Sequence, residues 1–268
     1  MTRVTKRALT VRGLSVSYGG VHALDGVDLD VSAGEIVGLI GANGAGKTTF
    51  IDALTGFTRS RGRVTLGARD ITRARPHRRA HLGLTRTFQA NELFHDLSVV
   101  ENVHVAMCRP GLGRAVRSVL NGRPVPEEGS RLALGLLGIE HLADLMPDEL
   151  SHGQRKLVSI ARAATTRPSV LCLDEPAAGL DSAETAQLGE QLRTIAGSGL
   201  AIILVDHDMD LVLEVSDTVS VLDFGRVIAR GEPSSVRANP IVHGAYLGAA
   251  DHDQPDVQAF GDVSLDAS

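Results

Sequence analysis

The sequence predicts an α/β fold whose core is interrupted by a mostly helical segment. Residues 8–90 carry β-type runs around one glycine-rich loop, residues 91–165 look mostly helical, and residues 166–232 alternate between strand and helix. A chain of 268 residues can form one large α/β domain or a core domain with a smaller lobe. We therefore expect one domain over residues 8–248, with a helical subdomain of about residues 91–165 inserted in its α/β core.

Composition and charge exclude several classes of protein. The longest apolar runs, such as Leu200–Val205, have the length of a strand and fall far short of the ~20 residues that a membrane helix needs. The formal net charge is −5, and the final segment supplies five aspartates with no Lys or Arg after Arg237. The rest of the chain is thus close to neutral, which argues against a nucleic-acid-binding protein. We interpret one local basic cluster as a solvated helix face: Arg73, Arg75, Arg78 and Arg79.

The end of the chain and the two cysteines carry no predicted chemistry. Residues 249–268 are small, polar and acidic, which predicts an acidic disordered tail. Cys108 and Cys172 lie in apolar segments without paired spacing. A disulfide framework or a zinc site is therefore not expected, and we predict buried thiols.

The first strand is predicted where apolar and polar residues alternate after the basic start of the chain. The apolar positions are Leu9, Val11, Leu14 and Val16. Alternation is typical of a strand with one buried face, whereas a signal peptide would have a continuous apolar core. We therefore expect the chain to remain in the cytosol.

A phosphate-binding loop follows the next apolar strand. Gly41–Thr48 reads G-A-N-G-A-G-K-T, between the strand-like run Glu35–Ile40 and the helix-compatible run Thr49–Leu54. The glycines let successive backbone N–H groups point at the β and γ oxygens of a nucleotide, with a helix dipole behind them. Lys47 adds a charge at the outer phosphates, and Thr48 offers a hydroxyl to Mg²⁺. This pattern predicts a nucleoside triphosphate binder.

A second anion site is predicted at the end of the helical segment. Leu150–Gln154 precedes a predicted helix over Arg155–Thr165, and Ser151 has the spacing of a capping box with Gln154. A purely local cap is one interpretation. The other is that the free N–H groups of the first turn bind a phosphate, which Gly153 allows to approach the backbone.

Two carboxylates end a predicted parallel strand. Val170–Glu175 is an apolar run that delivers Asp174 and Glu175 to the edge of the sheet where ligands bind in α/β folds. Asp174 suits Mg²⁺, and Glu175 suits orienting and deprotonating a water that attacks the γ-phosphorus. The alternative is that both acids cap the next helix, which the following Pro176 fits equally well.

In this order, the motifs resemble those of the nucleotide-binding subunit of an ATP-binding cassette (ABC) transporter. The resemblance covers nearly the whole chain before the tail. Gly41–Thr48 match the Walker A loop, Gln89 the Q-loop, Leu150–Gln154 the signature, Leu171–Glu175 Walker B, Ala178–Asp181 the D-loop, His207 the switch histidine and Tyr18 the aromatic that stacks on adenine. The signature carries His152 in place of the first glycine of the usual L-S-G-G-Q.

The resemblance implies an ABC-type P-loop NTPase with an antiparallel β subdomain and an inserted helical subdomain. It implies an ATPase that uses ATP and Mg²⁺, in which two cassettes close head to tail around the nucleotide. The implied catalytic residues are Glu175, His207 and Gln89, and the implied Mg²⁺ ligands are Thr48, Gln89 and Asp174. The implied nucleotide contacts are Tyr18, Gly41, Ala42, Asn43, Gly44, Ala45, Gly46, Lys47, Thr48 and Thr49 of one subunit, with Ser151, Gly153 and Gln154 of the facing subunit, and Asp181 of the D-loop.

Several strings resemble the branch of the family that takes up branched-chain amino acids. They are Leu84–Gln89, Glu92–Phe94, Leu97–Val103, Glu175–Leu180, Asp206–Val212 and Ala245–Gly248, and the extra residues around Gly111–Gly129 fit one of the two ATPase types of that branch. The implied partners are a second ABC ATPase subunit, as a homodimer or heterodimer, two transmembrane permease subunits and, indirectly, an extracytoplasmic solute-binding protein. The chain would then lie at the cytoplasmic face of the cell membrane as a peripheral subunit, with no nucleic-acid partner.

Three alternatives keep the same fold. Importers for urea or short amides share most of these strings, and no residue of this chain is expected to touch the transported solute. A soluble ABC scaffold ATPase would have soluble partners in place of permeases. A regulatory nucleotide-binding module would bind nucleotide without hydrolysing it, and the presence of Glu175 and His207 argues against this alternative.

Overall fold

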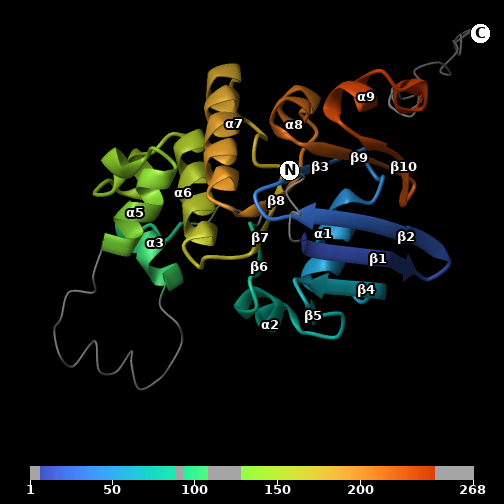
Figure 1. Cartoon of the computed structure of the whole chain (residues 1–268). Coiled ribbons are helices and arrows are strands. Elements are labelled where there is room, and N and C mark those ends of the chain that lie inside the picture. The colour runs from blue at the N-terminus through green and yellow to red at the C-terminus, as the bar shows by residue number, and fades with distance from the viewer. Residues whose placement is uncertain (1–6, 88–92, 108–127, 245–268) are drawn as a thin grey trace, which may run out of the picture.

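The computed structural model describes residues 7–87, 93–107 and 128–244 (Figure 1). The predictions made for Gln89, Cys108 and the tail over residues 249–268 lie outside these ranges. In the described part of the chain the strands form two sheets, one of six strands and one of four.

The larger sheet is predominantly parallel. Its strands, in spatial order, are β10 (Arg226–Gly231), β9 (Thr218–Asp223), β3 (Ile36–Ile40), β8 (Ala201–Val205), β7 (Val170–Asp174) and β6 (Leu84–Arg86). All neighbours pair in parallel except β9 and β10, which form an antiparallel hairpin. The carboxyl ends of β3, β8 and β7 therefore meet at one edge of the sheet.

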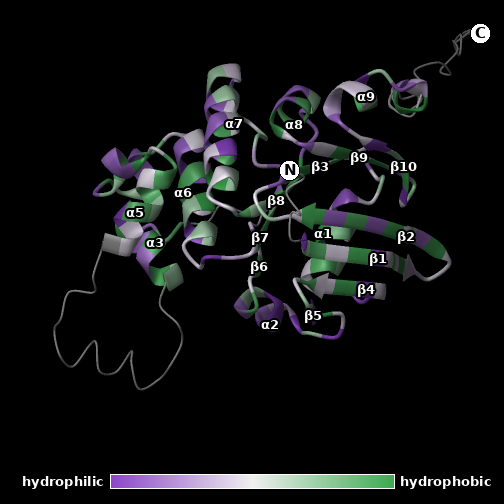
Figure 2. Cartoon of the chain, in the orientation of Figure 1, coloured by the Kyte–Doolittle hydropathy of each residue, from purple (hydrophilic) through white to green (hydrophobic). Residues whose placement is uncertain are grey.

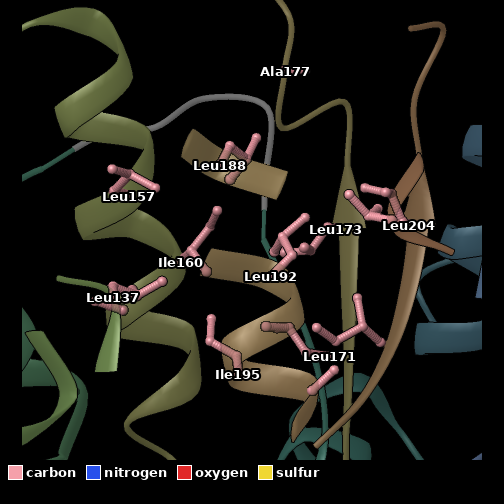
Figure 3. Packing of buried hydrophobic residues seen from close by; sticks show 14 of the residues in the cluster. Leu137, Leu157, Ile160, Leu171, Leu173, Ala177, Leu188, Leu192, Ile195 and Leu204 are labelled. Carbon is pink, nitrogen blue, oxygen red and sulfur yellow. The ribbon is translucent and has the colours of Figure 1, made fainter. Parts of the chain in front are cut away.

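Both faces of the middle of this sheet are covered, which explains why β3, β7 and β8 are apolar at nearly every position. Leu171 and Leu173 of β7 point into one core, and Val170 and Cys172 point into the other. Cys172 is fully buried, as predicted, and burial raises the pKa of its thiol to about 12. Figure 3 shows the first core, where side chains of α6 (His152–Ala164) and α7 (Ser182–Gly197) pack against β7 and β8.

The smaller sheet is antiparallel and covers the second core. It contains β2 (Val21–Ser32), β1 (Arg7–Tyr18), β4 (Arg61–Leu66) and β5 (Arg69–Asp70), in that order. Hydrophobic and hydrophilic residues alternate along β1 and β2 (Figure 2). The four apolar residues that predicted the first strand are all buried: Leu9, Val11, Leu14 and Val16.

A group of helices lies between β6 and β7 in the sequence and on the opposite side of the molecule from the smaller sheet (Figure 1). It contains α3 (Val99–Met107), α5 (Glu128–Leu136), the short 3₁₀ helices η1 (Glu140–Leu142) and η2 (Pro147–Glu149), and α6. The predicted fold class, an α/β core with an antiparallel β subdomain and an inserted helical subdomain, is confirmed. No helix in the described ranges combines the length and the hydrophobicity that a membrane span requires.

The remaining helices are α1 (Lys47–Thr55), α2 (Pro76–His81), α8 (Met209–Val215) and α9 (Pro233–Arg237). At α2 one sequence interpretation is wrong. Arg79 does not belong to a solvated face, because it is only 3% exposed. Its guanidinium donates to the carbonyl oxygens of Ala53 and Leu54 at the end of α1, which satisfies acceptors that a helix C-terminus leaves open.

Candidate functional site

The phosphate loop lies between β3 and α1, as the sequence predicts, and neighbouring backbone holds it closely. At Gly41, a Cβ atom would lie 2.2 Å from the carbonyl oxygen of Leu222, so no side chain fits. Gly46 has a φ of +105°, in the left-handed region, and caps α1 without a side-chain hydrogen bond. The first turn of α1 contains no acidic residue. Its N–H groups and dipole are therefore available to an anion.

Lys47 reaches across this loop. Its Nζ donates to the carbonyl oxygens of Gly41 at 2.7 Å and Ala42 at 3.1 Å, and the residue is 7% exposed. Burial lowers the pKa of Lys47, while Glu175, Asp174 and Asp206 oppose that shift. The ammonium thus lies inside the loop, where the charges of three carboxylates reach it. Next to it, Thr48 is exposed and Thr49 is half-buried.

The strand registers bring the other predicted groups to the same level. Val205 of β8 pairs with Leu39 of β3 on one side and with Asp174 of β7 on the other. The phosphate loop, the two carboxylates after β7 and His207 after β8 therefore emerge from neighbouring strands at one edge. This is the edge at which parallel α/β sheets bind ligands.

Asp174 has the features of a metal ligand. It is 4% exposed, and its Oδ2 pairs with Nη2 of Arg86 at 3.1 Å. Its Oδ1 is buried without a hydrogen-bond partner. Burial raises the pKa of Asp174, and the neighbouring Glu175 adds to that shift, while Arg86 and Lys47 oppose it. An orphaned carboxylate oxygen fits Mg²⁺, which prefers oxygen ligands.

Glu175 leaves the strand in a left-handed conformation, with a φ of +50°. Its backbone N–H still donates to the carbonyl oxygen of Val205 at 2.7 Å. The alternative that Asp174 and Glu175 cap the next helix is wrong. That helix, α7, begins only at Ser182, and Asp181 caps it by accepting from the N–H of Glu184 at 2.8 Å.

Two functional candidates were missed in the sequence. Arg86 on β6 links Asp174 to Asp52 of α1 through an ion pair with each, so it joins the strand of the carboxylates to the helix of the phosphate loop. Asp206 is fully buried. Its Oδ2 accepts from the N–H of Ala177 at 2.9 Å, and its Oδ1 lies 3.4 Å from Nδ1 of His207. An acid directly before the predicted switch histidine was the available signal for Asp206.

Three of the signature residues, Ser151, Gly153 and Gln154, line a different cavity from the two carboxylates. Ser151 caps α6 by accepting from the N–H of Gln154 at 3.2 Å, and the Gln154 side chain accepts from the Ser151 N–H at 2.9 Å, which is the predicted capping box. Ser151, Gly153 and Gln154 line a cavity of about 130 Å³ with Glu184, whereas Asp174 and Glu175 line another of about 280 Å³.

Tyr18 ends β1 and is 55% exposed, with its hydroxyl 3.4 Å from that of Thr58. An exposed ring at this position is free to stack on a planar ligand. The predicted contacts of Gln89 lie outside the described residues.

Comparison with known proteins agrees with this arrangement. A family model described as ABC transporter matches residues 24–178, and one described as Branched-chain amino acid ATP-binding cassette transporter matches residues 226–252.

Among curated relatives, the chain is 38% identical over 250 residues to the high-affinity branched-chain amino acid transport ATP-binding protein LivG of Salmonella typhimurium. This alignment covers 90% of this chain and 98% of the relative. It is 36% identical over 256 residues to BraF of Pseudomonas aeruginosa, a protein of the same description, with 92% and 100% covered. Among solved structures, a nucleotide-free ATP-binding cassette from an ABC transporter superposes with a TM-score of 0.78 at 32% identity, covering 90% of this chain and 98% of that one. The ADP conformation of an ATP-binding cassette also superposes with a TM-score of 0.78 at 32% sequence identity, and the match covers 91% of this chain and 100% of that one.

Proposed function

The chain belongs to the ABC transporter family of ATP-binding cassettes, and we propose that it is the ATP-hydrolysing subunit of an importer for branched-chain or other small amino acids. The observation that carries the hydrolytic part is the common register of β3, β8 and β7 at Val205, which brings Lys47, Asp174, Glu175 and His207 to one edge. The amino-acid part rests on the relatives and on the family match over residues 226–252.

In the proposed mechanism, the phosphate loop from Gly41 to Thr49 holds the phosphates of ATP, with Tyr18 stacked on the adenine. Lys47 exchanges its bonds to the Gly41 and Ala42 carbonyl oxygens for bonds to phosphate oxygens. Thr48, Asp174 and Gln89 would hold Mg²⁺, which neutralises the charge on the phosphates when bound. The unpaired Oδ1 of Asp174 supports this assignment.

Glu175 then orients the attacking water and accepts its proton, and His207 holds the γ-phosphate on the other side. Nδ1 of His207 lies 3.4 Å from Oδ1 of Asp206, which orients the ring, and an N–H at Nε2 would donate to a γ-phosphate oxygen. Gln89 would report the state of the site to the helical subdomain.

A second cassette, as an identical or a sibling chain, would complete each site. Its Ser151, Gly153, Gln154 and Asp181 would cover the nucleotide bound to Lys47 of the first. Ser151, Gly153 and Gln154 line a cavity that does not include Asp174 or Glu175, which supports this division between two chains. Further proposed partners are two membrane permeases and, through them, a solute-binding protein. The proposed location is the cytoplasmic face of the cell membrane.

Uptake measurements test this function. Cells that lack the chain are complemented with the wild type or with Glu175→Gln, and uptake of labelled leucine, urea and an unrelated sugar is compared. We expect the wild type alone to restore leucine uptake. Restoration of urea uptake in its place would assign the cargo to the amide branch, and no effect on any solute would contradict the role as an importer subunit.

A further inference from the structure

Lys156 is a buried cation that the proposed mechanism does not use. It lies in the second turn of α6 and is 4% exposed. Its Nζ donates to the carbonyl oxygen of Ala178 and lies 3.5 Å from the carbonyl oxygen of Glu175. In the described part of the chain it forms no salt bridge with a carboxylate. Its ammonium is thus directed at the main chain of the turn that follows β7.

This position is costly for a lysine. Burial lowers the pKa of Lys156, while the charges of Asp206, Glu175 and Glu184 oppose that shift. An apolar side chain of similar length would avoid the loss of hydration. Packing alone therefore does not explain why this position of α6 holds a lysine, whereas the hydrogen bonds to the two carbonyl oxygens do.

The turn that Lys156 contacts contains a strained residue, which the surrounding structure has to hold in place. Glu175 has a φ of +50°, a conformation that costs a residue with a side chain about 1 kcal/mol or more. The N–H of Ala177 is held by Asp206 from the side of β8. From the side of α6, Lys156 donates to the carbonyl oxygens of Glu175 and Ala178, so hydrogen bonds from two elements hold the main chain of this turn.

A second contact joins α6 to the same turn. The His152 ring lies 3.5 Å from the point where a Cβ atom at Gly179 would stand. His152 and Lys156 are four residues apart and therefore share a face of the helix. Both line the cavity of about 280 Å³ that Asp174 and Glu175 also line. Further along α6, Leu157 and Ile160 belong to the core that includes Leu171 and Leu173 of β7 (Figure 3).

We infer that Lys156 is a positioning residue for hydrolysis, which sets the main chain of Glu175 and of the turn after it from the helix that carries the signature. The inference rests on the proposed ATPase function. The N-cap and first turn of α6 hold Ser151, Gly153 and Gln154. A shift of α6 against the facing nucleotide would therefore move Lys156, and with it the main chain of Glu175 in the same cassette. This connects the two sites of a cassette pair through one side chain.

The test compares steady-state ATP hydrolysis by the wild type, Lys156→Met and Arg155→Met. Arg155 is a matched control, because it is a neighbouring cation on α6 whose Nε donates to Pro147 and not to the turn after Glu175. Loss of a charge-assisted hydrogen bond in the transition state corresponds to a decrease of about 10- to 100-fold in rate. We expect kcat of Lys156→Met to fall by that factor, with KM for ATP changed less than about twofold and an unchanged melting temperature, and Arg155→Met to keep wild-type kcat.

The inference is overturned if Lys156→Met retains wild-type kcat, or if Arg155→Met loses as much activity. If Lys156→Met does not fold, Lys156→Gln carries the same test, because it removes the charge but keeps a polar group in the cavity. An unchanged kcat in that variant then overturns the inference. A wild-type protein without ATPase activity would contradict the proposed function instead, so the two failures are distinguishable.

Discussion

The carboxylate of Asp206 accepts a hydrogen bond from the main-chain N–H of Ala177 at 2.9 Å, and both groups are buried. Asp206 directly follows β8, and Ala177 belongs to the turn after Glu175. The same carboxylate accepts from the N–H of Asp208 at 3.0 Å and lies 3.4 Å from the ring of His207. One buried acid therefore fixes the histidine relative to the proposed general base, although His207 and Glu175 are 32 positions apart in the sequence.

Asp206→Asn should slow hydrolysis more than it weakens ATP binding. An amide keeps the shape of the carboxylate but turns one of its two acceptors into a donor, which then faces the N–H of either Ala177 or Asp208. The loss of one hydrogen bond to a charged group predicts a decrease of about 10- to 100-fold in kcat. Steady-state kinetics measure this effect. Asp210→Asn is the control, because Asp210 is exposed and pairs with Arg237 at the surface; an equal loss in that variant would count against a specific role for Asp206.

Asp174→Asn should stabilise the nucleotide-free protein while abolishing Mg²⁺-dependent hydrolysis. The pKa of Asp174 is raised in the folded chain, chiefly by burial. A carboxyl of this kind binds its proton more tightly in the folded state. Its contribution to stability is therefore greatest at low pH and is lost as the pH rises through the folded pKa. At pH 7 the Asp174→Asn variant avoids this loss of stability, because its amide is neutral at every pH, and Arg86 keeps its ion pair with Asp52.

Thermal unfolding of the wild type and Asp174→Asn, at pH 7 and at pH 5, measures this difference. We expect the variant to have the higher Tm at pH 7 and its advantage to shrink at pH 5, where the wild-type carboxyl is closer to its neutral form. A lower Tm for the variant at pH 7 would mean that the ion pair with Arg86 outweighs the cost of burial.

Lys47→Ala should lose nucleotide affinity. The ammonium supplies the positive charge inside the phosphate loop, and its removal leaves only main-chain donors for the phosphates. A loss of about 10- to 100-fold in affinity corresponds to one charge-assisted interaction. Fluorescence titration with a labelled ATP analogue measures the affinity, and circular dichroism checks the fold. Wild-type affinity in a folded variant would exclude Lys47 from phosphate binding.

Local patterns in the sequence predicted the parts of the site that one segment builds by itself. The phosphate loop depends on glycines within eight residues, and the capping box depends on Ser151 and Gln154, three residues apart. The strands that lead into the phosphate loop, the two carboxylates and His207 are β3, β7 and β8. Each was predicted from its continuous apolar run, because a strand covered on both faces has no polar side.

The contacts that join these segments were not predictable from local patterns. Arg86 and Asp174 are 88 residues apart, and Arg79 and Ala53 are 26 apart. Their pairing depends on how β6 and α2 lie against α1 and β7, which a periodicity does not encode. The sequence indicated only a basic cluster at Arg79, and the packing of α2 on the end of α1 turned that residue inward. Lys156 was missed for the same reason.

The central claim is that Glu175 acts as the general base of an ATP site built at the edge of β3, β8 and β7. The most direct test follows purified Glu175→Gln with Mg·ATP, together with its natural partner subunits, by measuring phosphate release and the nucleotide and oligomeric state retained on gel filtration. We expect steady hydrolysis to fall by about 10²- to 10⁴-fold while unhydrolysed ATP remains bound in a cassette dimer. Normal turnover by this variant, or solitary cassettes at saturating Mg·ATP, would contradict the account.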